Sequence, residues 1–196
     1  MSIVFEEGRL ELTFDDSWRI ARWDGERAYK EGIRVLKTTH AVDFCGIRDD
    51  GREPTLYLIE LTDLRDHRIE WKKQLTGRSA PACEACGRFQ PNLYEEVALK
   101  VRDTVAGLVA AAHVRQTESE RWRSFAGALA RWDQQLRVVL WLEEEQAPAP
   151  VAPNVITDRL KKELRWLTAR AMVVNSSRPL PGVTVRHLPP AGAPRS

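Results

Sequence analysis

Two acidic side chains lie inside apolar segments of this 196-residue sequence, where an uncompensated carboxylate is costly. Asp43 belongs to the segment Ala41–Ile47, and Glu60 belongs to the segment Leu56–Leu61. Turn-forming residues at 49–54 separate the two segments, so the pattern predicts an antiparallel hairpin. Adjacent strands can then bring both carboxylates to one place, because side chains alternate between the faces of a strand. A Mg²⁺ or Mn²⁺ ion would neutralise them, since magnesium takes one or two protein carboxylates and completes its shell with water and phosphate oxygens.

The helices and strands predicted after the hairpin narrow the choice of fold. Apolar residues recur at helical spacing from Leu93 to Ala112, and the continuous apolar run Val138–Leu142 is typical of a strand buried on both faces. An Asp and a Glu on a hairpin, followed by alternating helices and strands, resemble the PD-(D/E)xK nuclease superfamily. The resemblance covers about residues 25–175. Shorter stretches resemble a group of uncharacterised bacterial members: Ala41–Ile47, Leu56–Arg65 and Glu95–Leu108.

The resemblance implies a restriction-endonuclease-like α/β fold and metal-dependent hydrolysis of DNA phosphodiesters. Asp43 and Glu60 would hold Mg²⁺ or Mn²⁺, and DNA would be the partner. Such an ion lowers the pKa of its bound water and stabilises the phosphate transition state. The sequence departs from the family at Thr62, where the family has a lysine that positions or helps to deprotonate the attacking water.

Two explanations for Thr62 stay open. In the first, another of the seven lysines reaches the same point. Lys100 is the main candidate, because it lies about 60° from Val97 on the flank of the predicted helix. Lys72 and Lys73, just beyond the second strand, are further candidates. The competing interpretation of Lys100 is a surface lysine that pairs with Glu96 four residues earlier.

In the second explanation the catalytic lysine is lost, and the chain is an inactive pseudonuclease that serves as a nucleic-acid or protein interaction module. The two acids would then be structural groups: Asp43 an acid near the turn or in a salt bridge, and Glu60 a partner for an arginine such as Arg65 or Arg102.

The small net charge of +2 conceals an uneven distribution, with −4 over residues 1–150 and +6 over residues 151–196. A helix predicted over Thr157–Arg170 carries much of this basic charge opposite its leucines. It forms a candidate contact to the DNA backbone, and a solvated helix face is the alternative. The candidate residues are Arg159, Lys161, Lys162 and Arg165.

Cys83 and Cys86 have the CxxC spacing of half a zinc site, although structural zinc needs four ligands. Cys45, His67 and His113 would have to complete the site, or a second subunit would have to supply a matching pair. A loop with free thiols is the alternative interpretation. The odd number of cysteines argues against a disulfide framework and suits a reducing compartment.

We therefore expect a single α/β domain over residues 1–188, with residues 1–24 as an extension and residues 189–196 as a flexible tail. A mixed sheet should have helices on both faces, and the later strands should pair in parallel. The sequence has neither a basic N-terminal region of the signal-peptide type nor an apolar run of membrane-spanning length, which predicts a cytoplasmic protein without a membrane partner. A homodimer or a partner protein is compatible with these features.

Overall fold

The computed structural model describes residues 2–32, 34, 39–51, 53–63, 65, 93–113, 119–131, 135–143 and 153–189. The predicted loop 76–91, with Cys83 and Cys86, lies outside these residues, as do Lys72, Lys73 and positions 190–196 of the predicted tail.

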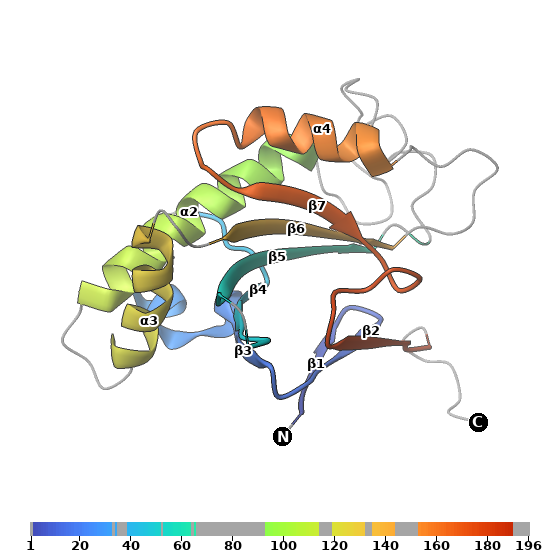
Figure 1. Cartoon of the computed structure of the whole chain (residues 1–196), viewed down its shortest axis with the longest axis horizontal. Helices are drawn as coiled ribbons and strands as arrows, with labels where there is room; N and C mark the ends of the chain where they lie inside the picture. Colours follow the sequence, from blue (N-terminus) through green and yellow to red (C-terminus); the bar gives the residue numbers. More distant parts are fainter. Residues whose placement is uncertain are drawn as a thin grey trace.

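A five-stranded mixed sheet forms the centre of the described structure (Figure 1). Its strands, in spatial order, are β3 (Trp18–Arg22), β4 (Phe44–Arg48), β5 (Thr55–Asp63), β6 (Leu136–Glu143) and β7 (Arg170–Val174). β4 pairs antiparallel with both β3 and β5, whereas β5, β6 and β7 pair in parallel. The predicted hairpin and the predicted parallel pairing of the later strands are both confirmed.

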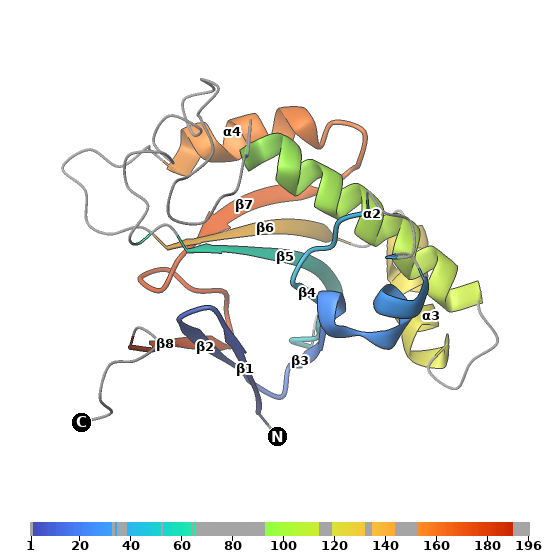
Figure 2. The same cartoon turned by 180° about the vertical axis from the view of Figure 1, so that it is seen from behind.

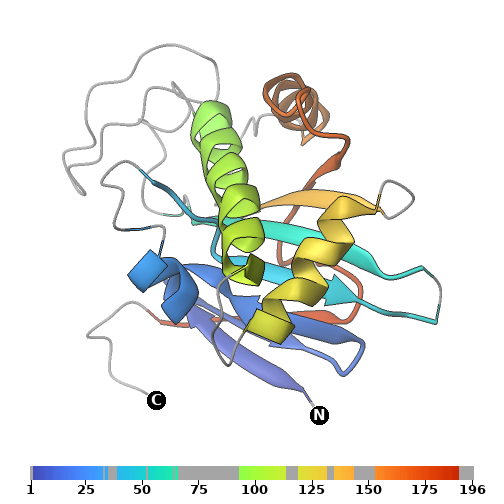
Figure 3. The same ribbon diagram turned by 90° about the vertical axis from the view of Figure 1, so that its left-hand side faces the viewer.

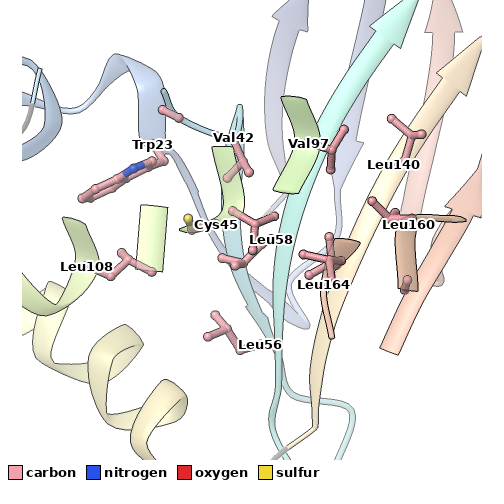
Figure 4. Packing of buried hydrophobic residues seen from close by; sticks show 14 of the residues in the cluster. Trp23, Val42, Cys45, Leu56, Leu58, Val97, Leu108, Leu140, Leu160 and Leu164 are labelled. Carbon is pink, nitrogen blue, oxygen red and sulfur yellow. The ribbon is translucent and has the colours of Figure 1, made fainter. Parts of the chain in front are cut away.

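Three helices cover one face of this sheet: α2 (Leu93–His113), α3 (Ser119–Ala130) and α4 (Pro153–Glu163) (Figures 2 and 3). Their apolar faces meet alternate residues of the strands in one buried cluster, in which Figure 4 shows Cys45, Leu58 and Val97 among other members. A 3₁₀ turn (Trp23–Gly25) and a π-helical turn (Ala28–Gly32) lie at the edge of this layer.

In the described part of the chain a second sheet, and not a helix, covers the opposite face, so the expectation of helices on both faces is wrong there. The strands β1 (Ile3–Glu7), β2 (Leu10–Phe14) and β8 (Val183–His187) form it in the antiparallel order β1-β2-β8. Buried residues on one side of β2 and β8 pack against Phe44, Tyr57 and Trp141. The reason is the strict alternation in β2, which gives it one apolar face that only another apolar surface can cover.

Segment boundaries differ most at the last helix. α4 begins at Pro153, which suits the first turn because proline lacks the N–H that has no helical partner there. It ends at Glu163 instead of Arg170, and residues 164–167 form a turn before β7. Within the described ranges, none of the helices combines the length and apolar character that a membrane crossing requires.

Candidate active site

The hairpin positions the two acids as its register dictates. Phe44 pairs with Ile59, so continuing the register by one residue places Asp43 opposite Glu60. Since Cys45 and Leu58 face the helices, alternation directs Asp43 and Glu60 to the same side. The backbone N–H of Leu61 donates to Asp43 Oδ2 at 2.7 Å, which fixes this carboxylate against β5. The shared face predicted for the two acids is thus the one that the strand pairing produces.

Lys100 reaches the site from α2. Val97 and Val101 anchor this helix in the core, and the lysine extends from its flank with only 19% of its side chain exposed. Its ammonium binds Glu60 Oε1 and lies 3.4 Å from Glu96 Oε1. The predicted pairing with Glu96 and the predicted reach to the hairpin therefore occur together.

Within the described ranges, the two arginines considered as partners of Glu60 pair with other acids. Arg65 binds Asp63 at 2.7 Å and 2.8 Å, and Arg102 binds Asp103 at 2.8 Å. The cation that contacts Glu60 in the described structure is Lys100.

Burial dominates the electrostatics of the site. It raises the pKa of Glu60 well above its usual range, and the charge of Asp43 raises it further, while Lys100 opposes both effects. Burial also raises the pKa of Asp43 to about 6, against the hydrogen bond from Leu61 and the charge of Lys100. Burial alone would lower the pKa of Lys100, but Glu60, Glu96 and Asp43 together raise it, so this lysine stays protonated.

In the described structure, three further charged residues that were not predicted from the sequence border the site. Arg22 at the end of β3 binds Glu7 of β1, lies 3.2 Å from Asp24 Oδ1 and donates to the carbonyl of Glu6 at 3.2 Å. The negative charges of Glu7 and Asp24 both raise the pKa of Asp43. No spacing in the sequence points to them, because they meet through the packing of β1 near the end of β3.

The charges of this neighbourhood do not cancel. Among the described residues, five carboxylates surround two cations, which leaves an excess of three negative charges when all of these groups are ionised. The carboxylates are Glu7, Asp24, Asp43, Glu60 and Glu96, and the cations are Arg22 and Lys100. Glu60 Oε2 is buried and has no hydrogen-bond partner among the residues that the structure describes. A bound cation would satisfy this oxygen and reduce the repulsion among the acids.

These residues fit a magnesium ion better than a metal held by many protein ligands. In the described part of the chain, no three or more His, Cys, Asp or Glu side chains group closely enough to hold a metal ion. Magnesium does not require such a group, because one or two carboxylates suffice when water and substrate phosphate complete the octahedron. Asp43 and Glu60 are the residues that would hold it.

The remaining candidate residues are dispersed. Thr62 is half-buried on β5, pairs with Leu142 of β6 and shares the face of Glu60 by alternation. Cys45 is buried in the core beneath the helices, and His113 is the last residue of α2. His67 lies outside the described residues, together with Cys83 and Cys86.

The basic residues of α4 have different environments. The guanidinium of Arg159 lies 5.7 Å from the centre of the Tyr94 ring, and Lys161 Nζ lies 3.3 Å from Asp158 Oδ1. Lys162 is exposed, as is Arg165 in the turn that follows α4. The helix thus presents part of its basic charge to solvent.

Comparison of the chain with protein-family models, with curated proteins and with solved structures returned no match.

Proposed function

We propose that this protein is a metal-dependent nuclease in which Asp43 and Glu60 hold Mg²⁺ or Mn²⁺. Lys100 takes the place of the lysine that the nuclease superfamily has at the position of Thr62. The observation that carries the proposal is the contact between Lys100 and Glu60, made from a helix that lies 40 positions further along the chain. A lysine beside the second carboxylate is the feature that the motif at Thr62 is missing. The α2 helix supplies that charge from another direction.

The protonation of Lys100 defines its role. Because its pKa is raised, the ammonium keeps its proton at neutral pH and does not act as a base. It would donate a hydrogen bond to the attacking water or to a phosphate oxygen and offset the negative charge that develops there. The bound metal would polarise the phosphate and activate water. Hydrolysis joins the water oxygen to phosphorus and releases one ester oxygen.

The carboxylates have separate tasks within this arrangement. Asp43 is held through Oδ2 by the Leu61 N–H, which orients the carboxylate toward the helix face. Glu60 is held through Oε1 by Lys100, which leaves Oε2 for the metal. The orientation of both groups by fixed donors reduces the reorganisation needed when metal and substrate bind.

The test is cleavage of plasmid and of single-stranded DNA in the presence of Mg²⁺, Mn²⁺ or EDTA. The wild-type protein should cleave with metal and not with EDTA, and Glu60→Ala should remove the activity. Glu31→Ala is the matched control, since Glu31 is an exposed acid that pairs with Arg27 on the surface. Cleavage that persists in Glu60→Ala would refute the assigned site. Absence of cleavage by the wild type, with nucleic-acid binding retained, would favour the interaction module.

A further inference from the structure

One tryptophan differs from the others in its exposure to solvent. Trp166 is 48% exposed, whereas four other tryptophans in the described ranges are at most 3% exposed, namely Trp18, Trp23, Trp122 and Trp141. It lies in the turn between α4 and β7. The N–H of Leu167 donates to the carbonyl of Leu164 at 2.8 Å, and Leu164 is buried in the core. The buried Leu164 anchors the turn, and Trp166 of the same turn exposes a large apolar ring to solvent.

Several cationic residues close to Trp166 in the sequence lack acidic partners among the described residues. Lys162, Arg165 and Arg170 are exposed, and within the described part of the chain none of them forms an ion pair. Lys161 differs, because Asp158 neutralises it. Residues 159–170 contain five cations and one acid, so the segment has a local charge of +4. Unpaired cations of this kind are available to phosphates.

We propose that Lys162, Arg165, Trp166 and Arg170, which we call the α4–β7 platform, bind an unpaired nucleic-acid strand. The indole would stack on the face of a base, and the three cations would contact the phosphates on either side. Stacking is tolerant of sequence because every base has a flat aromatic face, and it requires that the face is free. Paired bases hide these faces within the duplex, so the platform should distinguish single strands from duplexes.

The chemistry of the patch favours this ligand over an anionic lipid surface. A helix that lies in a lipid interface needs a continuous apolar face. The apolar side of α4 is instead buried against the sheet through Ile156 and Leu160. Only isolated apolar groups face solvent here, at Val155 and Trp166. One aromatic ring among cations suits a nucleotide strand.

The platform and the candidate active site lie toward different ends of the parallel strands. Arg170, the last residue of the platform, is the first residue of β7 and is in register with Arg137 of β6, whereas Glu60 is in register with Leu140 of β6 (Figure 1). The two positions are therefore roughly 10 Å apart along the strand direction. The proposal concerns binding alone, so its outcome is independent of whether Asp43 and Glu60 support cleavage.

The experiment is a titration of the full-length chain with a 12-nucleotide oligothymidine in EDTA, followed by intrinsic tryptophan fluorescence and by anisotropy of a labelled strand. Wild-type fluorescence should be quenched on binding. Trp166→Ala should weaken binding about 5- to 160-fold, the range expected for loss of one stacked base. Trp166→Phe should keep most of the affinity and lose most of the quenching. Val155→Ala, which removes an exposed apolar side chain from α4, should behave as the wild type.

A second measurement tests the cations. The double variant Lys162→Ala/Arg165→Ala should reduce the slope of log affinity against log salt by about 1.4, because each lost phosphate contact on a single strand contributes about 0.7. The proposal is overturned if Trp166→Ala binds oligothymidine as tightly as the wild type, or if a hairpin duplex binds as well as the single strand. It is also overturned if only anionic phospholipid vesicles, and no oligonucleotide, change the fluorescence in a way that depends on Trp166.

Discussion

Replacing Asp43 by asparagine should make the protein more stable, and the gain should depend on pH. Asparagine keeps an oxygen that can accept the hydrogen bond from Leu61, so the substitution mainly removes a charge. Burial raises the pKa of Asp43 from its ordinary value of 3.8 to about 6 in the folded protein. The difference between these pKa values is worth about 3 kcal/mol at about 1.36 kcal/mol per unit.

The direction of this pH dependence follows from the linkage between proton binding and folding. An acid whose pKa is higher in the folded state binds its proton more tightly there, so the folded state is favoured at low pH. This stability is fully present below about pH 3.8 and is lost as the pH rises through about 6. At pH 8 the wild type carries the full unfavourable effect, and Asp43→Asn carries none. We expect a free energy of unfolding up to about 3 kcal/mol higher for the variant at pH 8, and no gain at pH 3.5.

The assay is thermal and chemical unfolding in EDTA at pH 8 and pH 3.5. For a chain of this size, a gain of about 3 kcal/mol corresponds to about 6–12 °C in Tm. Asp63→Asn is the matched control of opposite sign, because hydrogen bonds and charge from Arg65, acting against burial, lower the pKa of Asp63. That variant should lose stability at pH 8. A variant Asp43→Asn that is less stable than the wild type at pH 8, or whose gain does not depend on pH, would refute the description of Asp43 as a destabilised buried acid.

Three further substitutions test the packing and pairing on which the site depends. Lys100→Met should destabilise the protein by about 3 kcal/mol at pH 8, because Glu60 is then a buried carboxylate without its main cation. Chemical denaturation should show a smaller loss of stability at pH 5, where Glu60 protonates more readily, and an equal loss at both pH values would contradict this. Gly46→Ala should lower stability by roughly 1–3 kcal/mol, since an added Cβ would lie 2.7 Å from Ile20 Cδ1, and an unchanged denaturation midpoint would show that the neighbours move freely. Glu143→Ala should lower the free energy of unfolding by about 3 kcal/mol, because the indole N–H of Trp141 and the backbone N–H and hydroxyl of Ser176 lose their buried acceptor. A loss of stability below about 0.5 kcal/mol in denaturation experiments would contradict that role.

The part of the site that is local in sequence could be predicted. Alternation in two strands of a hairpin is enough to place Asp43 and Glu60 on one face. Helical periodicity is enough to place Lys100 beside the apolar stripe that packs on that face. These residues depend on short-range geometry, which repeats regularly along the chain.

The surroundings of the site could not be predicted in the same way. Glu7 and Arg22 meet only because β1 and β3 pack together from different sheets. The layer opposite the helices depends on pairing between β2 and β8, which are separated by more than 160 residues. Such pairing is decided by long-range packing, which no pattern within a single segment specifies.

Moving the lysine from position 100 to position 62 is the most direct test of the proposal that Lys100 completes the active site. Metal-dependent cleavage of plasmid DNA would be measured for the wild type, for Lys100→Met and for Lys100→Met combined with Thr62→Lys, with Lys30→Met as the exposed-lysine control. We expect Lys100→Met to lose at least about 100-fold in rate, in the range for one positioned charged group. The double variant should regain activity, and the control should match the wild type. A Lys100→Met protein that cleaves at the wild-type rate would contradict the claim that this lysine completes the site.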